Sequence, residues 1–302
     1  KKNIVNLKKN YKNYYHYNLD IRNLSRLKKI FKKYGKKISF IVHCAGQPSH
    51  DWAVREPFVD YSINSTGTLN VLECLRTKSP KAKLAHLSTN KVYGDRPNFL
   101  KIIEKNKRYE INVKDKFYKK GVNESMSIDD CKHSLFGASK VSADIYCQEY
   151  IKYFNLKIGI FRAGCLTGAL HQGAELHGFL NYLIKVAKEK KTYKIFGYKG
   201  KQVRDNIHSQ DVVSALWEFY KTSNNSGIYN MGGERENSCS ILEVIDILKK
   251  NYNIHLKYQF VKTNRKGDHI WYISDMSKFK KKHKKWKIQK SLTQIIDELI
   301  IS

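Results

Sequence analysis

The stretch from Leu84 to Lys140 constrains the fold of this chain more than any other part of its sequence. An apolar run at 84–87 passes directly into the polar segment Ser88-Thr89-Asn90-Lys91. The stretch closes on residues 133–140, which are followed by a helical pattern to about Tyr153. A buried strand, a loop with hydroxyl groups and a lysine at the start of a helix are typical of open α/β sheets, which carry their chemistry at the carboxyl ends of their strands.

Short apolar runs alternate with helical patterns along most of the chain. Runs with strand character cover 38–43, 84–87, 156–161 and 227–231. Helical spacing of apolar residues covers 23–34, 64–73, 139–154 and 211–220. This alternation predicts an α/β fold with a doubly wound parallel sheet. Further helices at 180–188, 242–252 and 291–301, with strands at 194–197 and 258–262, predict a smaller carboxy-terminal subdomain. The polar insert 96–132 is expected to be a surface excursion or a lid.

Composition narrows the class of protein. A chain of 302 residues with 41% hydrophobic residues can bury a full core. No run reaches the roughly 18 apolar residues of a membrane span, and the chain does not begin with a signal-peptide pattern. We expect a soluble cytoplasmic protein without a membrane partner. The six cysteines lack metal-ligand spacing, so no metal site is expected.

The net charge of +30 raises the question of nucleic acid binding. The excess is mostly lysine spread along the chain, including the run 278–287, which we expect to be a solvated helix or turn. The sequence therefore does not predict a nucleic acid partner. A positive surface would still attract an anionic nucleotide substrate.

Four motifs carry a resemblance to a known family. They are the Ser88-Thr89 pair, the Gly137-Ala138-Ser139-Lys140 helix start, the loop Cys44-Ala45-Gly46-Gln47 and the run from Gly200 to His208. Together they resemble the extended short-chain dehydrogenase/reductase superfamily. Within it they resemble the NAD-dependent epimerase/dehydratase family, and most of all nucleotide-sugar epimerases of the CDP-paratose 2-epimerase (tyvelose epimerase) type.

The resemblance implies a Rossmann-like fold that holds NAD and acts on a nucleotide-diphosphate sugar. It places an NAD-binding domain at 1–168, to which 206–232 return, and a substrate-binding subdomain at 169–205 and 233–302. Implied cofactor contacts are Asp20, Ile21, Ala45, Gly46, Gln47, Asn64 and Lys140. Implied substrate contacts are Asn90, Lys91, Arg204 and Arg265, with the catalytic positions at Thr89, Phe136 and Lys140. The family also implies a homodimer or a higher homo-oligomer, formed through helices such as 67–75 and 139–154.

Two departures from the family pattern affect this interpretation. The sequence up to Tyr17 lacks the strand, glycine-rich turn and helix of a dinucleotide-binding fold, so we expect the first β-α-β unit to be absent. In addition, Phe136 stands where the family has its catalytic tyrosine, and a phenylalanine offers no group that accepts a proton.

Three hypotheses for the reaction follow. In the first, an epimerase oxidises a sugar hydroxyl transiently and takes its base from another residue type near the site: Cys165, His133, His171, Glu175 or His177. In the second, the chain binds NAD and the sugar but acts as a dehydratase or reductase. In the third, it is a catalytically silent member that binds NAD or RNA.

Overall fold

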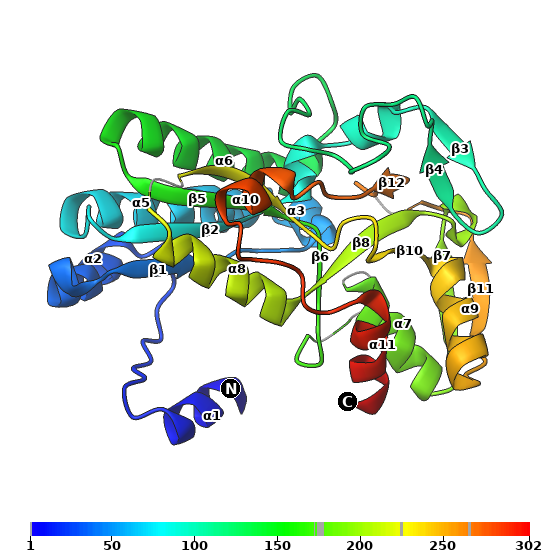
Figure 1. Ribbon diagram of the computed structural model, residues 1–302. Helices are drawn as coiled ribbons and strands as arrows, with labels where there is room; N and C mark the ends of the chain where they lie inside the picture. Colours follow the sequence, from blue (N-terminus) through cyan, green and yellow to red (C-terminus); the bar gives the residue numbers. More distant parts are fainter. Residues whose placement is uncertain (1, 172, 174–177, 224–225, 265–266) are drawn as a thin grey trace.

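The computed structural model describes the chain except at residues 1, 172, 174–177, 224–225 and 265–266 (Figure 1). Its strands are β1 (Phe40–His43), β2 (Lys83–Thr89), β3 (Ile102–Glu104), β4 (Tyr109–Ile111), β5 (Lys157–Ala163), β6 (Cys165–Thr167), β7 (Thr192–Phe196), β8 (Val203–His208), β9 (Gly227–Met231), β10 (Ser238–Ser240), β11 (Lys257–Val261) and β12 (Trp271–Tyr272). Its α-helices are α1 (Lys2–Asn10), α2 (Leu24–Tyr34), α3 (His50–Arg55), α4 (Pro57–Tyr61), α5 (Gly67–Lys78), α6 (Ser134–Phe154), α7 (Phe179–Lys188), α8 (Ser209–Lys221), α9 (Ile241–Tyr252), α10 (Ser277–Lys282) and α11 (Leu292–Ile301). Helical turns of other types are η1 (Gly35–Lys37), η2 (Ser62–Thr66), η3 (Asn90–Tyr93), η4 (Arg96–Phe99) and η5 (Tyr198–Gly200).

A parallel sheet in the order β1-β2-β5-β9 forms the centre of the amino-terminal half. Its central strand β5 alternates between two cores: Ile158 and Ile160 pack with α2, α5 and α6 on one face, while Phe161 and Ala163 pack with α8 on the other. Helices cover both faces of the sheet, as Figure 1 shows. The predicted α/β fold with a doubly wound parallel sheet is confirmed.

The carboxy-terminal half is built around β8. This strand pairs with β10 and β12 and also with β6, while β11 and β7 form a separate parallel pair. Helices α7, α9 and α11 pack together with β7 in one apolar core. Only Gly164 separates β5 of the first sheet from β6, so hydrogen-bonded strands continue from one half into the other.

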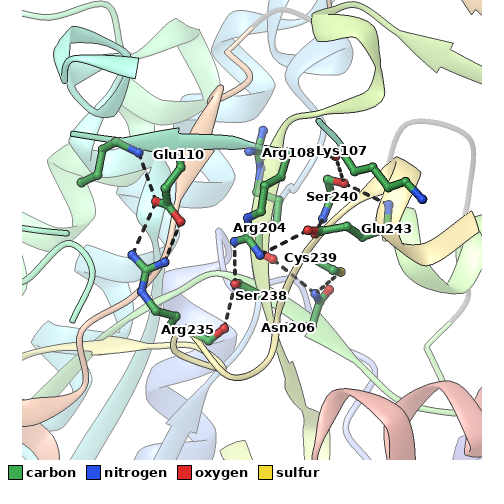
Figure 2. A network of polar contacts seen from close by, with 11 residues as sticks. Lys107, Arg108, Glu110, Arg204, Asn206, Arg235, Ser238, Cys239, Ser240 and Glu243 are labelled. Atoms are coloured by element: carbon green, nitrogen blue, oxygen red, sulfur yellow. Dashed lines mark hydrogen bonds and ion pairs between the residues drawn. The ribbon is translucent and has the colours of Figure 1, made fainter. Parts of the chain in front are cut away.

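The insert 96–132 differs from the expected surface excursion. It holds the antiparallel pair β3–β4, and its Ile111, Phe117 and Val122 are buried in a core that also contains Trp271 and Tyr272. Polar contacts fasten it as well: Glu110 pairs with Arg235 and Arg108 donates to Ser238 (Figure 2). The polar composition of the insert concealed these scattered apolar residues, which are enough to make it part of the folded body.

The lysine-rich run 278–287 is more than a solvated turn. Phe279 and Trp286 are buried against Phe161, Phe219 and Tyr229 of the first sheet's outer core. The lysines surround this apolar pair, so the segment is charged on its exposed side and packed on the other. The segment 277–286, which the resemblance places in the substrate-binding subdomain, thus packs on the parallel sheet of the predicted NAD-binding domain.

Candidate active site at the ends of β1 and β2

Asn64 holds the loop that follows β1 through several hydrogen bonds. Asn64 accepts a hydrogen bond from the backbone N–H of Gln47 at 2.8 Å and donates to the Gln47 carbonyl at 3.1 Å. Its amide also donates to the hydroxyl of Ser139 on α6 at 3.0 Å. Asn64 lies in the π-helical turn η2, a geometry that often occurs at functional sites. This one buried side chain therefore connects the predicted cofactor loop to the helix that carries Lys140.

Gly46 lets this loop approach its neighbours closely. A Cβ atom at Gly46 would lie 3.1 Å from the Asn64 side-chain oxygen and 3.9 Å from Nζ of Lys140. Ala45, Gly46 and Gln47 therefore lie beside both residues. Any larger side chain at Gly46 would fill the space next to the ammonium group.

Lys140 is buried where β1, β2 and α6 meet. Its Nζ donates to the carbonyl of Leu87 at 3.0 Å, the one hydrogen bond it makes among the described residues. An ammonium has three N–H donors, so two remain for a ligand in this polar, enclosed place. Burial lowers the pKa of Lys140 below its usual value. Buried donors without a protein partner beside a small-residue loop fit the hydroxyl groups of a ribose.

Phe136 lies one helical turn before Lys140, in the first turn of α6. The helix begins at Ser134, whose hydroxyl accepts from the N–H of Gly137, rather than at the expected Ser139. The Phe136 ring is buried, and its centroid lies 4.9 Å from that of the His50 ring, edge to face. His50 is not among the site residues predicted from the sequence. Its only sequence signal was its place in the small-residue loop after a strand.

The end of β2 carries the predicted substrate contacts. The Thr89 hydroxyl accepts from the N–H of Lys91 and starts the turn η3, in which Asn90 is buried. Nζ of Lys91 donates to the carbonyl of Gly267 at 2.9 Å. The closing segment 267–269 therefore lies against the end of β2.

Arg204 meets the same closing segment from the other side. Its guanidinium forms an ion pair with Asp268 and donates to the carbonyl of His269 (for the neighbouring residues of β8 and β10, see Figure 2). Lys91 and Arg204 thus hold adjacent residues of one segment, and Gly267 touches His50, which touches Phe136. The predicted catalytic and phosphate-binding positions are brought together through residues 267–269.

The structure also describes Asp20 and Ile21, two of the predicted cofactor contacts. Asp20 is exposed and paired with Arg22, while Ile21 lies on Gly67, one turn after Asn64. Arg265, Glu175 and His177 lie outside the described residues, so their predicted roles stay predictions.

Three of the predicted alternative bases are described. Burial raises the pKa of the Cys165 thiol to about 11, which keeps it protonated at neutral pH. His133 uses Nε2 to donate to the carbonyl of Val92 at 3.0 Å. His171 packs against Gly178 at the start of α7. None of these three has a contact with Phe136 among those the structure describes.

Within the part of the chain that the structure describes, no cluster of three or more His, Cys, Asp or Glu side chains could hold a metal ion. The described helices are each too short or too polar to cross a membrane.

The sequence model of the NAD dependent epimerase/dehydratase family matches residues 2–232. The chain belongs to this family. This membership confirms two predictions at the level of the family: the cofactor NAD and an enzyme of the epimerase class.

Relatives and solved structures agree with this membership. CDP-paratose 2-epimerase of Salmonella typhi is 32% identical over 268 residues, covering 86% of this chain and 75% of the relative. UDP-glucuronate 4-epimerase of Thermodesulfobacterium geofontis (strain OPF15) is 27% identical, covering 92% of this chain and 76% of the relative.

Among solved structures, a tyrosine-to-phenylalanine mutant of the UDP-glucuronic acid 4-epimerase of Bacillus cereus, with NAD and a fluorinated UDP-sugar bound, has a TM-score of 0.78 at 24% identity, over 99% of this chain and 84% of that one. The dTDP-glucose 4,6-dehydratase of Bacillus anthracis str. Ames has a TM-score of 0.77 at 22% identity, over 99% and 82% of the two chains. At these identities the likeness shows the fold.

Proposed function

We propose that this protein is a nucleotide-sugar epimerase that inverts one sugar carbon by transient oxidation of its hydroxyl, with a CDP-sugar inverted at C2 as the substrate class. The observation that carries the proposal is the buried ammonium of Lys140, with donors to spare beside the Gly46 loop. The similarity to a CDP-paratose 2-epimerase over 86% of the chain supports the choice of sugar and nucleotide.

Each part of the site has a role in this proposal. Lys140 and the backbone of Gly46 and Gln47 would hold the nicotinamide ribose, and Asp20 and Ile21 the adenine end. NAD, when bound, supplies the acceptor and donor of the hydride. Thr89 would hydrogen-bond the reacting sugar hydroxyl.

The substrate end of the site is cationic. Arg204 would bind the diphosphate, because a guanidinium presents its donors in pairs that match phosphate oxygens. Asn90, Lys91 and Arg265 would complete the sugar and phosphate contacts. Asp268 lies on the Arg204 guanidinium and would fix its plane toward the diphosphate.

The test is a substrate screen on the purified full-length protein. Protein supplied with NAD is incubated with CDP-, UDP- and dTDP-sugars, and products are followed by proton NMR. We expect one epimerised sugar carbon, without net change in NADH. A keto-deoxy sugar would instead identify a dehydratase, and binding without turnover of any sugar would identify a silent member; either result would contradict the proposal.

A further inference from the structure

The proposed reaction requires a group that removes the proton of the sugar hydroxyl. Phe136 cannot do so, because its ring has only C–H groups. The aromatic partner of that ring is His50, at a centroid distance of 4.9 Å and an interplanar angle of 65°. The imidazole of His50 therefore lies beside the ring that occupies the position of the family tyrosine.

The His50 ring is oriented by the first turn of α6. Its Nδ1 lies 2.9 Å from the hydroxyl of Ser134, two residues before Phe136. Ser134 adopts a left-handed backbone conformation with φ of 62°, and its hydroxyl also accepts from the N–H of Gly137 at 3.2 Å. A base held by a hydrogen bond through its second nitrogen is the arrangement that general bases require. In this left-handed conformation, the hydroxyl of Ser134 fixes the orientation of the His50 imidazole.

The closing segment holds the other side of the ring. Gly267 has φ of +69°, and a Cβ atom there would lie 2.7 Å from Cε1 of His50. Only a glycine at position 267 lets the closing segment come this close to the His50 ring. The carbonyl of the same glycine accepts from Lys91, and the next residue, Asp268, pairs with Arg204. The imidazole therefore lies between the Phe136 position and the groups proposed to bind the sugar diphosphate.

We propose that His50 is the general base of this enzyme and takes the place of the family tyrosine. This inference rests on the proposed epimerase function. This assignment requires the tautomer in which Nδ1 donates to the Ser134 hydroxyl, so that the lone pair is on Nε2. Nε2 of His50 would take the proton of the sugar hydroxyl while bound NAD would accept the hydride from the same carbon, which leaves a ketone. After the ketone has presented its opposite face, the same hydride and proton would return to it and give a hydroxyl of opposite configuration.

An imidazole also removes a requirement of the tyrosine mechanism. A phenol with a pKa near 10 needs a neighbouring ammonium to ionise at neutral pH, whereas a free imidazole has a pKa near 6.5. Lys140 is then needed for the ribose alone, which agrees with its burial.

The decisive variant is His50→Gln, compared with His255→Gln at an exposed position in the carboxy-terminal half. We expect His50→Gln to lower kcat by about 10²–10⁴-fold while the dissociation constants of NAD and the nucleotide sugar stay within about threefold. The acid limb of the wild-type kcat/KM profile should vanish. The double variant His50→Gln/Phe136→Tyr should recover part of kcat, because the phenol returns beside Lys140. Unchanged kcat and pH profile in His50→Gln, or weakened binding that accounts for the whole loss, would overturn the assignment.

Two measurements on the wild-type protein do not depend on the variant folding. Its kcat/KM should fall below a pH near the imidazole pKa, and a flat profile down to pH of about 5 would contradict a histidine base. In NMR spectra with labelled histidine, nucleotide sugar should shift the Nε2 resonance of His50, since the substrate hydroxyl donates to that nitrogen. An unchanged Nε2 resonance in a protein that binds the sugar would overturn the role of His50. Absence of sugar binding and turnover in the wild type would instead refute the epimerase function itself.

Discussion

Arg162 of β5 and Asp144 of α6 form an ion pair beneath the ends of the parallel strands, with Nη2 and Oδ1 2.9 Å apart and the side chains 3% and 0% exposed. The hydroxyl of Ser88 donates to the same carboxylate at 2.7 Å, next to Thr89 in the sequence. The pair therefore fixes the end of β2 against α6.

Removing one partner of this pair should be costly. Asp144→Ala leaves the Arg162 guanidinium buried without its counter-charge, which typically costs about 3–5 kcal/mol. We expect the free energy of unfolding in urea to fall by that amount. Ser88→Ala, the control, removes one hydrogen bond to the carboxylate and should cost about 1.5–3 kcal/mol. An Asp144→Ala loss no larger than the control's would show that the pair is not a buried unit.

The variant Lys140→Met should bind NAD more weakly than the wild type but be more stable near pH 7. NAD affinity should fall about tenfold or more with the loss of charged donors, measured by calorimetry. Below the folded-state pKa of Lys140, native and unfolded chains are both protonated, and the native state bears the full cost of the buried charge. The methionine variant should then be more stable than the wild type near pH 7. Its advantage should shrink as pH rises through the folded pKa toward 10.5. An advantage that grows with pH would contradict the lowered pKa.

Arg204→Lys tests the geometry of diphosphate binding. A lysine keeps the charge but loses the paired donors and the contact with Asp268. We expect nucleotide-sugar affinity to weaken about 10–100-fold, a loss of about 1.4–2.8 kcal/mol, with NAD affinity unchanged. Arg76→Lys is the control, since this arginine pairs with Glu73 within α5. Equal losses for both ligands would argue that Arg204 acts through the fold.

Asp205→Asn should stabilise the protein above pH 6. Burial raises the pKa of Asp205 to about 6 from 3.8, so between these values the native state holds a proton that the unfolded chain has lost. Stability therefore falls as pH rises through this window, by up to about 3 kcal/mol. An asparagine oxygen can still accept from the N–H groups of Glu234 and Ser274. Thermal melts should show a gain at pH 7.5 that disappears near pH 4, and the exposed Asp51→Asn should show none. A gain independent of pH would point to another cause.

The predicted homodimer uses the helices at 67–75 (α5) and 139–154 (α6). Helix α6 and the neighbouring helix α4 leave large apolar side chains exposed, among them Phe58 at 89%, Tyr61 at 51% and Tyr153 at 78%. We expect light scattering to give twice the chain mass for the wild type and one chain mass for Phe58→Lys/Tyr153→Lys. Lysine at the exposed Val213 of α8 is the matched control. A monomeric wild type would contradict the dimer.

The parallel sheet was predictable because its strands are short apolar runs between amphipathic helices. The runs 38–43, 84–87 and 156–161 correspond to β1, β2 and β5. The burial of Phe279 and Trp286 was not predictable, since lysines surround both in the sequence. The start of α6 was missed because Ser134 has a left-handed backbone conformation that local propensity does not indicate.

The candidate site was only partly predictable. Family motifs led to Thr89 at the end of β2, Lys140 in the second turn of α6 and Arg204 near the beginning of β8. His50 was not predicted, because its partner Ser134 lies 84 positions away and no local pattern connects them. Contacts of that kind are set by how the loop after β1 and the start of α6 come together in the folded chain.

The pairing of β6 with β8 bears on how a substrate enters. Since one residue joins β5 to β6, a large rotation of the carboxy-terminal half about a hinge would break a ladder of main-chain hydrogen bonds. Substrate would then enter and leave without a large change in the relative orientation of the two halves.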